Sequence, residues 1–385
     1  MKKKSLILFI SMFLGILCGL FFKDFSIFIK PLGTLFINLL FQIVVPLVFF
    51  TIATSIMKNK KYFSNTILKI LKYFVLTSLV ATLVMLIAVL VFNPAKDLSL
   101  QITSQTISSN NFLESFVNAL SVNDFNLLLS KNNILALILF AIAFGYYTEN
   151  EKISTTFESI TNTLLKIVDL IMYYAPIGIF AFLASTTSEY GESIIKTYGL
   201  TMLLYYVVSF LYFFIFNFIY SYSYNKMDGV KMFFKEIIPS FICSMSTQSS
   251  LATLPTNIMV AKRMKLNNEV TDISLPLGST IHMEGSCMSA VLKIVFLFTV
   301  FGMDFLNPTS IILCIIISII SGIVMSGIPG GGLIGEALIV SMYGFPEYSL
   351  AYLATIGWLV DMPATMLNAT GDISSSMLIC KNINN

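Results

Sequence analysis

The chain has 385 residues, of which 56% are hydrophobic and only 11% are charged. Charged residues make up about a quarter of a typical soluble domain, so the composition excludes one and indicates a polytopic membrane protein. The net charge of +3 is small and scattered and gives no support for nucleic-acid binding. The apolar residues form long blocks without period-2 alternation, which predicts spanning helices and an all-α fold.

Lysines set the expected orientation of the first six apolar blocks. Lys2 to Lys4 place the N-terminus in the cytoplasm, and the loop after the second block is again rich in lysine, as a cytoplasmic loop should be. We interpret the first block as a spanning helix and not as a signal peptide, because no small-residue cleavage site follows it. The six blocks are 5–22, 33–57, 73–94, 133–147, 167–187 and 198–224.

Two later apolar stretches are too interrupted to be simple spanning helices. The stretch 237–261 has a serine-rich centre and ends in a basic cluster at 262–265, which favours the cytoplasm. The stretch 311–343 is broken at 326–332 by one proline and several glycines, which cannot continue a helix. We therefore expect two re-entrant hairpins, the first entering from the cytoplasm and the second from outside.

Each expected hairpin is followed by a spanning block with polar residues at its centre, at 273–300 and 348–380. Two such units entering from opposite sides form the inverted repeat that is typical of secondary transporters, which bind substrate and ions at the midplane. The last block carries Asp361 and Asp372. An unpaired carboxylate at mid-bilayer costs about 2.5–3.5 kcal/mol, so two of them indicate bound cations, buried partners or a water-filled cavity.

The residues of these segments resemble the dicarboxylate/amino acid:cation symporters, also called the glutamate transporter family, over essentially the whole chain. The resemblance rests on the order and spacing of several motifs, since any one of them alone would be weak evidence. The most specific are Ser249-Ser-Leu-Ala-Thr-Leu-Pro255, Pro276-Leu-Gly-Ser-Thr-Ile-His-Met-Glu-Gly-Ser286, Gly327-Ile-Pro-Gly330 and Asp361 to Asp372.

The resemblance implies a homotrimer in the cytoplasmic membrane, with eight spanning helices and two re-entrant hairpins in each subunit. Both termini are expected in the cytoplasm, and the protein is expected to be a transporter and not an enzyme. The family also implies a static scaffold, here residues 1–66 and 112–187, and a mobile transport core, here 67–94 and 198–385. In this arrangement the core carries the substrate by an elevator-like movement, and the second hairpin acts as the outer gate.

By correspondence with the family motif, Asp361 accepts hydrogen bonds from the amino group of a substrate and Asn368 donates to its α-carboxylate. A zwitterion that leaves water needs such fixed partners for both of its charges. Asn368 lies seven residues after Asp361, on the same helix face, which favours this role over a plain interhelical hydrogen bond. The other expected substrate contacts are Ser249, Ser250, Ser286, Ile328, Pro329, Gly330 and Thr365.

Sodium is the cofactor that the resemblance implies, since Asp372 matches a sodium-ligating carboxylate. Broken helices expose the hard oxygen ligands that sodium prefers. The alternative interpretation of Asp372 is an interfacial acid near the cytoplasm. The expected ligands are Asp372 with carbonyls near Gly278, His282 and Asn368, carbonyls around Thr280 and at 323–325, and, at a third site, Thr77, Ser78 and Glu284.

The expected substrate follows from a missing arginine. Ala364 occupies the position of the arginine with which acidic-substrate members hold the side-chain carboxylate, and the sole arginine, Arg263, lies in a basic loop. Gln248 occupies a first-hairpin position that can be arginine in the family. Without a guanidinium, a second substrate carboxylate would be buried unpaired, so we predict a small neutral amino acid of the serine, threonine or alanine kind. A proton-coupled carrier, or one for acidic amino acids or dicarboxylates, is the alternative within the same fold.

His282 and Glu284 replace an asparagine and an aspartate of the family motif, which predicts that the third cation site is either lost or uses a proton in place of sodium. Gly357 stands where an acidic residue is common, and Phe74 where a tyrosine is common. These two departures bear on the sodium stoichiometry and leave the expected fold unchanged.

Other functional classes are less well supported by the sequence. An aspartyl protease is excluded because Asp361 and Asp372 lie about 16 Å apart along one helix and cannot share a proton. A serine hydrolase would have only His282 as its base. An anion-conducting channel is the open alternative of another class, and saturable, sodium-dependent counterflow would distinguish a carrier from it.

Overall fold

The computed structural model of the protein describes residues 2–59, 65–95, 117, 120–130, 133–190, 192–325 and 331–383. Within these ranges the regular structure is helical, with no strand, as the sequence predicts for an all-α membrane protein. Five helical segments among the described residues are long and apolar enough to cross a membrane. They are Leu68–Val91, Lys196–Glu236, Asn268–Val300, Pro308–Met325 and Ser349–Lys381. The expected total of eight spanning helices and two re-entrant hairpins stays a prediction.

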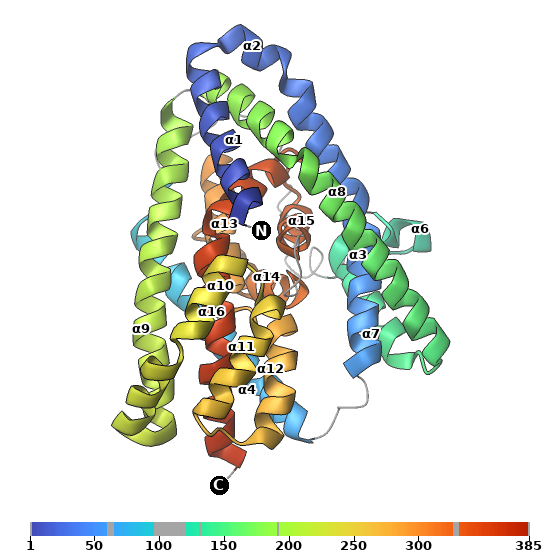
Figure 1. Ribbon diagram of the computed structural model, residues 1–385. Helices are drawn as coiled ribbons and strands as arrows, with labels where there is room; N and C mark the ends of the chain where they lie inside the picture. The colour runs from blue at the N-terminus through green and yellow to red at the C-terminus, as the bar shows by residue number, and fades with distance from the viewer. Residues whose placement is uncertain are drawn as a thin grey trace.

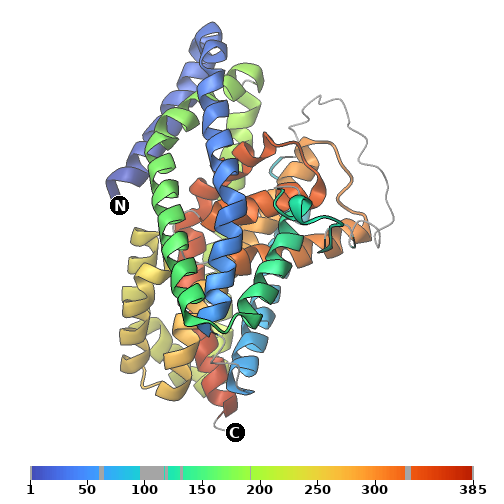
Figure 2. The ribbon, with the colours of Figure 1, turned by 90° about the vertical axis from the view of Figure 1, so that its right-hand side faces the viewer.

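The first half of the chain forms a group of long helices that pack along one another. Helix α8 contacts both α1 and α3, and α3 also contacts α7. Figure 2 shows α3 and α8 running side by side over most of their length. Glycine permits the close approach, because a Cβ at Gly178 of α8 would collide with the Phe36 side chain of α3. The elements are α1 (Lys2–Phe21), α2 (Lys23–Phe28), α3 (Lys30–Asn59), α6 (Phe125–Leu128), α7 (Ile134–Tyr147) and α8 (Glu151–Tyr190).

The remaining helices surround α16 (Ser349–Ile383), which is buried along most of its length. Figure 1 shows α16 running through this part of the molecule toward the C-terminus. It contacts α4, α9 and each helix from α10 to α13, as well as α15. The other helices of this part are α4 (Asn65–Val91), α9 (Glu192–Glu236), α10 (Ile238–Thr247), α11 (Ser250–Arg263), α12 (Asn268–Ile281), α13 (Glu284–Val300), α14 (Pro308–Met325) and α15 (Gly331–Tyr343).

The block 273–300, which the sequence presents as one spanning segment, is divided into α12 and α13. The break lies at His282 and Met283, where His282 has an extended backbone with φ −100° and ψ 95°. By contrast, α16 is continuous through its polar centre, although Pro363 lies inside it. Helix α9 extends beyond the predicted block 198–224 into the basic region, through a kink at Asn225 and Lys226.

Each segment that the sequence predicts to be a hairpin contains two helices in contact with each other. In the first, α10 and α11 are joined at Gln248 and Ser249, and both helices also contact α16. Gln248 adopts the left-handed conformation with φ 51°, and Ser249 caps α11 by accepting a hydrogen bond from the Ala252 N–H at 3.2 Å. In the second, α14 contacts α15. The predicted site residues Ile328, Pro329 and Gly330 lie between these two helices, outside the described residues.

Candidate functional site

A buried group of residues around His282, the His282 cluster, joins four helices. The His282 Nδ1 lies 2.9 Å from Asp372 Oδ1, and its Nε2 lies 2.8 Å from Thr77 Oγ1. Nε2 also lies 3.5 Å from Glu284 Oε1, and the ring stacks on Phe74 with 4.3 Å between centroids. The structure therefore brings together residues that the sequence assigned to two separate cation sites.

Two carboxylate oxygens of the His282 cluster, Asp372 Oδ2 and Glu284 Oε1, have no hydrogen-bond partner within the described part of the chain. His282 and Asp372 are fully buried, and Glu284 is 2% exposed. A carboxylate buried without a counter-charge costs several kcal/mol, on the order of 3–5 when one partner of a pair is missing. Oxygen ligands with excess negative charge fit a hard monovalent cation, so the residues present are suited to hold sodium.

Gly278, Thr280, Asn368 and Ser78, which were also predicted as cation ligands, lie on helices that form this cluster, whereas the predicted carbonyls at 323–325 lie at the end of α14. Gly278 is next to Asp372, because a Cβ at Gly278 would lie 2.5 Å from Asp372 Oδ1. The Gly278 carbonyl accepts the His282 N–H at 2.9 Å. Thr280 donates to the Leu277 carbonyl at 2.8 Å, and Ser78 is buried on α4. The ligand roles of these residues stay predictions.

Asn368 connects α16 to the first turn of α13. Its Oδ1 accepts the N–H of Gly285 at 2.8 Å and that of Ser286 at 3.3 Å. Its Nδ2 donates to Ser286 Oγ at 3.1 Å. Because the first N–H groups of a helix lack intrahelical partners, Asn368 satisfies donors that the break before α13 leaves free. Asn368 and Ser286 were both predicted to contact the substrate, and the structure adds that they bond to each other.

The predicted substrate residue Asp361 lies two turns before Asn368 and is half-buried. Thr365 Oγ1 donates to Asp361 Oδ1 at 3.3 Å, which joins two of the predicted residues on one face of α16. Ser249 and Ser250 are buried at the start of α11. Helix α11 is tied to α16 by Asn257, whose Nδ2 donates to the Ala369 carbonyl at 2.8 Å.

Sequence reasoning missed a second ionic group, the Lys293–Glu336 pair. Lys293 Nζ of α13 lies 2.8 Å from Glu336 Oε1 of α15, and both side chains are 3% exposed. Among the side chains that the structure describes, Lys293 is the only lysine or arginine that is buried. Lysine within an apolar helix was itself a signal, because a charge at that depth is costly unless it is paired.

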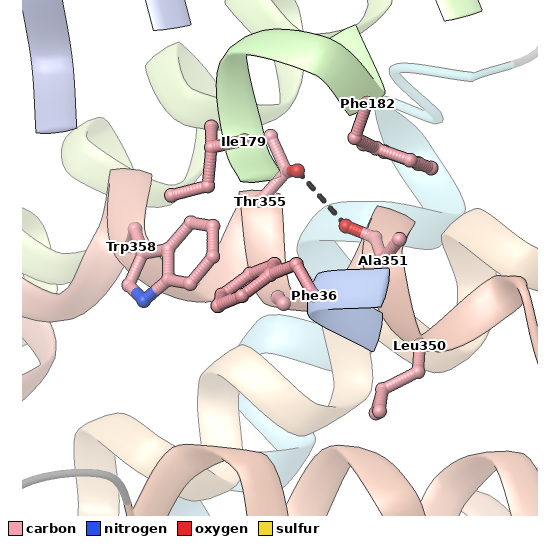
Figure 3. Close-up of a pocket in the computed structure, with 8 residues that line it drawn as sticks. Phe36, Ile179, Phe182, Leu350, Ala351, Thr355 and Trp358 are labelled. Carbon is pink, nitrogen blue, oxygen red and sulfur yellow. Dashed lines mark hydrogen bonds between the residues drawn. The ribbon is translucent and has the colours of Figure 1, made fainter. Parts of the chain in front are cut away.

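A small cavity lies between α3, α8 and α16. Figure 3 shows Phe36 and Trp358 at its wall, together with Ile179 and Phe182. The rings of Phe36 and Trp358 are 6.0 Å apart. The lining is apolar and offers no charged group to a zwitterion, so we do not assign the cavity to the substrate.

The order of the predicted motifs, the polar centre of α16 and the His282 cluster all point to one group of membrane carriers. A model of the "Sodium:dicarboxylate symporter family" matches residues 5–382. The chain belongs to the sodium:dicarboxylate symporter family. It is therefore a multi-pass membrane transporter and not an enzyme, as the sequence resemblance implied.

Curated members of the sodium:dicarboxylate symporter family align with nearly the whole chain. A proton/sodium-glutamate symport protein of Geobacillus stearothermophilus is 24% identical over 97% of this chain and 93% of its own length. A proton/glutamate-aspartate symporter of Bacillus subtilis (strain 168) is 27% identical over 98% of this chain and 95% of its own length. These alignments agree with the family match in covering nearly the whole chain.

Proposed function

We propose that the protein is a secondary active symporter that takes up a small neutral amino acid together with sodium. The observation that carries the proposal is the fully buried Asp372, whose Oδ2 has no partner among the described residues. A bound sodium ion would neutralise this carboxylate and travel with it. Ligands that bind one state of a carrier favour each other thermodynamically, which gives coupling between ion and substrate.

Asn368 is the proposed link between the ion and the substrate. It lies one turn before Asp372 on α16, and its side chain holds the first turn of α13 through Gly285 and Ser286. A cation at Asp372 would fix this part of α16, so that Asn368, Ser286 and the α11 N-terminus are oriented for the substrate α-carboxylate. Asp361, two turns away, would receive the ammonium group.

A neutral side chain is supported by the surroundings of Asp361. The only arginine, Arg263, is exposed at the end of α11, where it cannot form a guanidinium clamp. The buried Lys293 is already engaged by Glu336. A substrate with a second carboxylate would therefore bring an uncompensated charge into the site.

An acidic amino acid is the second candidate substrate, because two of the relatives have glutamate or glutamate and aspartate in their names. The same names pair proton with sodium or print proton alone, so a proton is the second candidate for the coupling ion. The substitution of His282 for asparagine supports a changed cation stoichiometry.

We also propose an elevator-like division of the chain into a scaffold, 1–66 and 112–187, and a transport core, 67–94 and 198–385. The contact between the two parts supports it, because it includes two aromatic ring pairs, Phe36 with Trp358 in a tilted arrangement and Phe182 with Tyr352 edge-on. Such an apolar contact offers little resistance to sliding. Assembly as a homotrimer in the cytoplasmic membrane, with both termini inside, belongs to the same proposal.

Reconstitution into liposomes tests the function directly. Purified protein would be given a panel of radiolabelled amino acids under a sodium gradient and, separately, under a proton gradient. We expect saturable accumulation of alanine, serine or threonine under the inward sodium gradient. If aspartate is taken up with an apparent affinity at least equal to that for alanine, the substrate is an acidic amino acid and not a neutral one. Unsaturable flux would support a channel.

A further inference from the structure

The Lys293–Glu336 pair lies beside Gly357, the position of α16 at which the family resemblance leads us to expect an acidic residue. Gly357 of α16 faces the pair, because a Cβ at this position would collide with Glu336 Oε1 and lie 3.2 Å from Lys293 Nζ. The acidic group missing from position 357 is therefore replaced in space by a carboxylate from α15. The positive charge of the pair is the ammonium group of Lys293 on α13.

The pair is close enough to the substrate residues to affect them. Asp361 follows Gly357 by one helical turn on α16, on the same face. Gly357 is itself next to Lys293 Nζ and Glu336 Oε1, so the pair lies about one helical turn from Asp361 along α16. Little water reaches the pair, because the side chains of Lys293 and Glu336 are each 3% exposed. Charges in such a medium interact several times more strongly than they would in water.

The Lys293–Glu336 pair is neutral as a whole, because it joins one positive and one negative side chain. Glu336 Oε1 takes the hydrogen bond from Lys293 at 2.8 Å, while Glu336 Oε2 has no partner within the described part of the chain. The pair thus cancels its own charge, and Asp361 is an acid near it for which the described residues show no ion pair. An amino acid with an uncharged side chain meets no free cation here.

We propose that the Lys293–Glu336 pair determines whether the protein accepts a substrate with a neutral or an acidic side chain. Glu336 neutralises Lys293, which would otherwise bind the second carboxylate of an acidic substrate. The inference deepens the proposed function and rests on it. Lys293 and Glu336 are specificity-determining residues in this account. They belong to α13 and α15, so the selectivity depends on α15 of the second predicted hairpin being packed against α13.

The variant Glu336→Gln keeps the shape of the side chain and removes its charge, which frees Lys293. We expect the ratio of aspartate uptake to alanine uptake in proteoliposomes to rise about tenfold, which corresponds to about 1.4 kcal/mol. Alanine uptake itself should fall, because the freed ammonium competes with the substrate amino group for Asp361. The double variant Lys293→Met/Glu336→Leu removes both charges and should keep the wild-type ratio.

Two controls separate a change of selectivity from damage to the fold. Ser289→Ala, one turn before Lys293 on α13, changes another buried polar side chain and should leave the ratio unchanged. Uptake of aspartate by the Glu336→Gln variant should return toward the wild-type level when Lys293→Met is added. An unchanged ratio in a Glu336→Gln protein that still takes up alanine overturns the inference while the proposed function stands. Absence of amino-acid uptake by the wild type overturns the proposed function itself.

Discussion

Two buried ionic groups lie along α16, and they differ in how their charges are balanced. In the His282 cluster, two carboxylates surround one imidazole, and Asp372 Oδ2 and Glu284 Oε1 have no hydrogen-bond partner among the described residues. The Lys293–Glu336 pair instead matches one cation with one anion at 2.8 Å. The first arrangement calls for a charge from outside the protein, and the second does not. The comparison separates the group that we propose to bind the transported ion from the pair that we propose to set substrate selectivity.

The largest expected effect comes from removing the charge that recruits the ion. Asp372→Asn should reduce sodium-driven amino-acid uptake at least about a hundredfold, because the buried carboxylate is the main attraction for the cation; that factor is about 2.7 kcal/mol. Uptake by proteoliposomes, normalised to inserted protein, is the measurement. Uptake within threefold of wild type would show that Asp372 does not serve the ion.

The next effect concerns stability and distinguishes the two groups. Lys293→Met leaves Glu336 buried without its partner, so we expect a loss of about 3–5 kcal/mol in the free energy of unfolding. Lys293→Met/Glu336→Leu should recover most of that loss, since both charges are gone. Thermal unfolding in detergent measures both variants. A double variant as unstable as the single one would contradict the description of the pair as self-balanced.

A smaller effect is expected on the sodium dependence. His282→Asn removes the ring nitrogen that bonds to Asp372 Oδ1, which leaves that oxygen free to ligate sodium. We expect the sodium concentration for half-maximal uptake to fall about three- to tenfold, as measured at saturating amino acid. Thr77 and Glu284 remain in place in this variant. An unchanged or higher sodium requirement would show that the imidazole does not compete with the ion.

The smallest effects come from two glycines of α16, one beside each group. A Cβ at Gly371 would lie 2.5 Å from Glu284 Oε2, and a Cβ at Gly357 would collide with Glu336 Oε1. Each alanine variant should cost about 1–3 kcal/mol of stability by overpacking. Gly371→Ala should alter the sodium dependence, whereas Gly357→Ala should alter substrate selectivity.

Gly199→Ala is the matched control for these glycines, because its Cβ would have no neighbour within 4 Å. Helix propensity alone predicts that it stabilises α9 by about 0.5–1 kcal/mol. Exchange of the two functional effects, with Gly371→Ala changing selectivity and Gly357→Ala changing sodium dependence, would contradict the assignment of separate roles.

Much of the fold could be predicted because a helix that crosses the bilayer core needs a long apolar stretch, which is visible in the sequence. The helical fold class followed from those blocks, and the helix ends around Gln248 and Ser249 followed from the serine-rich sequence. The division of 273–300 at His282 could not be predicted in this way. The interactions that stabilise the break come from Asn368 and Asp372, about ninety residues further on.

Some residues of the candidate site could likewise be predicted from the sequence, whereas others are revealed only by the packing of the helices. Asp361, Asn368 and Asp372 were identified because acids and amides are rare within a spanning helix. The proximity of Thr77 to His282 was suggested only by the family motif, and the structure gives the 2.8 Å contact. The Lys293–Glu336 pair could not be predicted, because its two residues lie in segments without a recognised motif. Only the packing of α15 against α13 shows that they meet.

The most direct test of the central claim is whether the amino acid and sodium move together through the same protein. Proteoliposomes would be loaded with sodium-free buffer and given equal trace ²²Na⁺ with or without an inward gradient of the transported amino acid. The account predicts that the gradient drives accumulation of ²²Na⁺ and that Asp372→Asn abolishes it. Entry of ²²Na⁺ at the same rate with and without the amino acid, in vesicles that do take up the amino acid, would contradict the account.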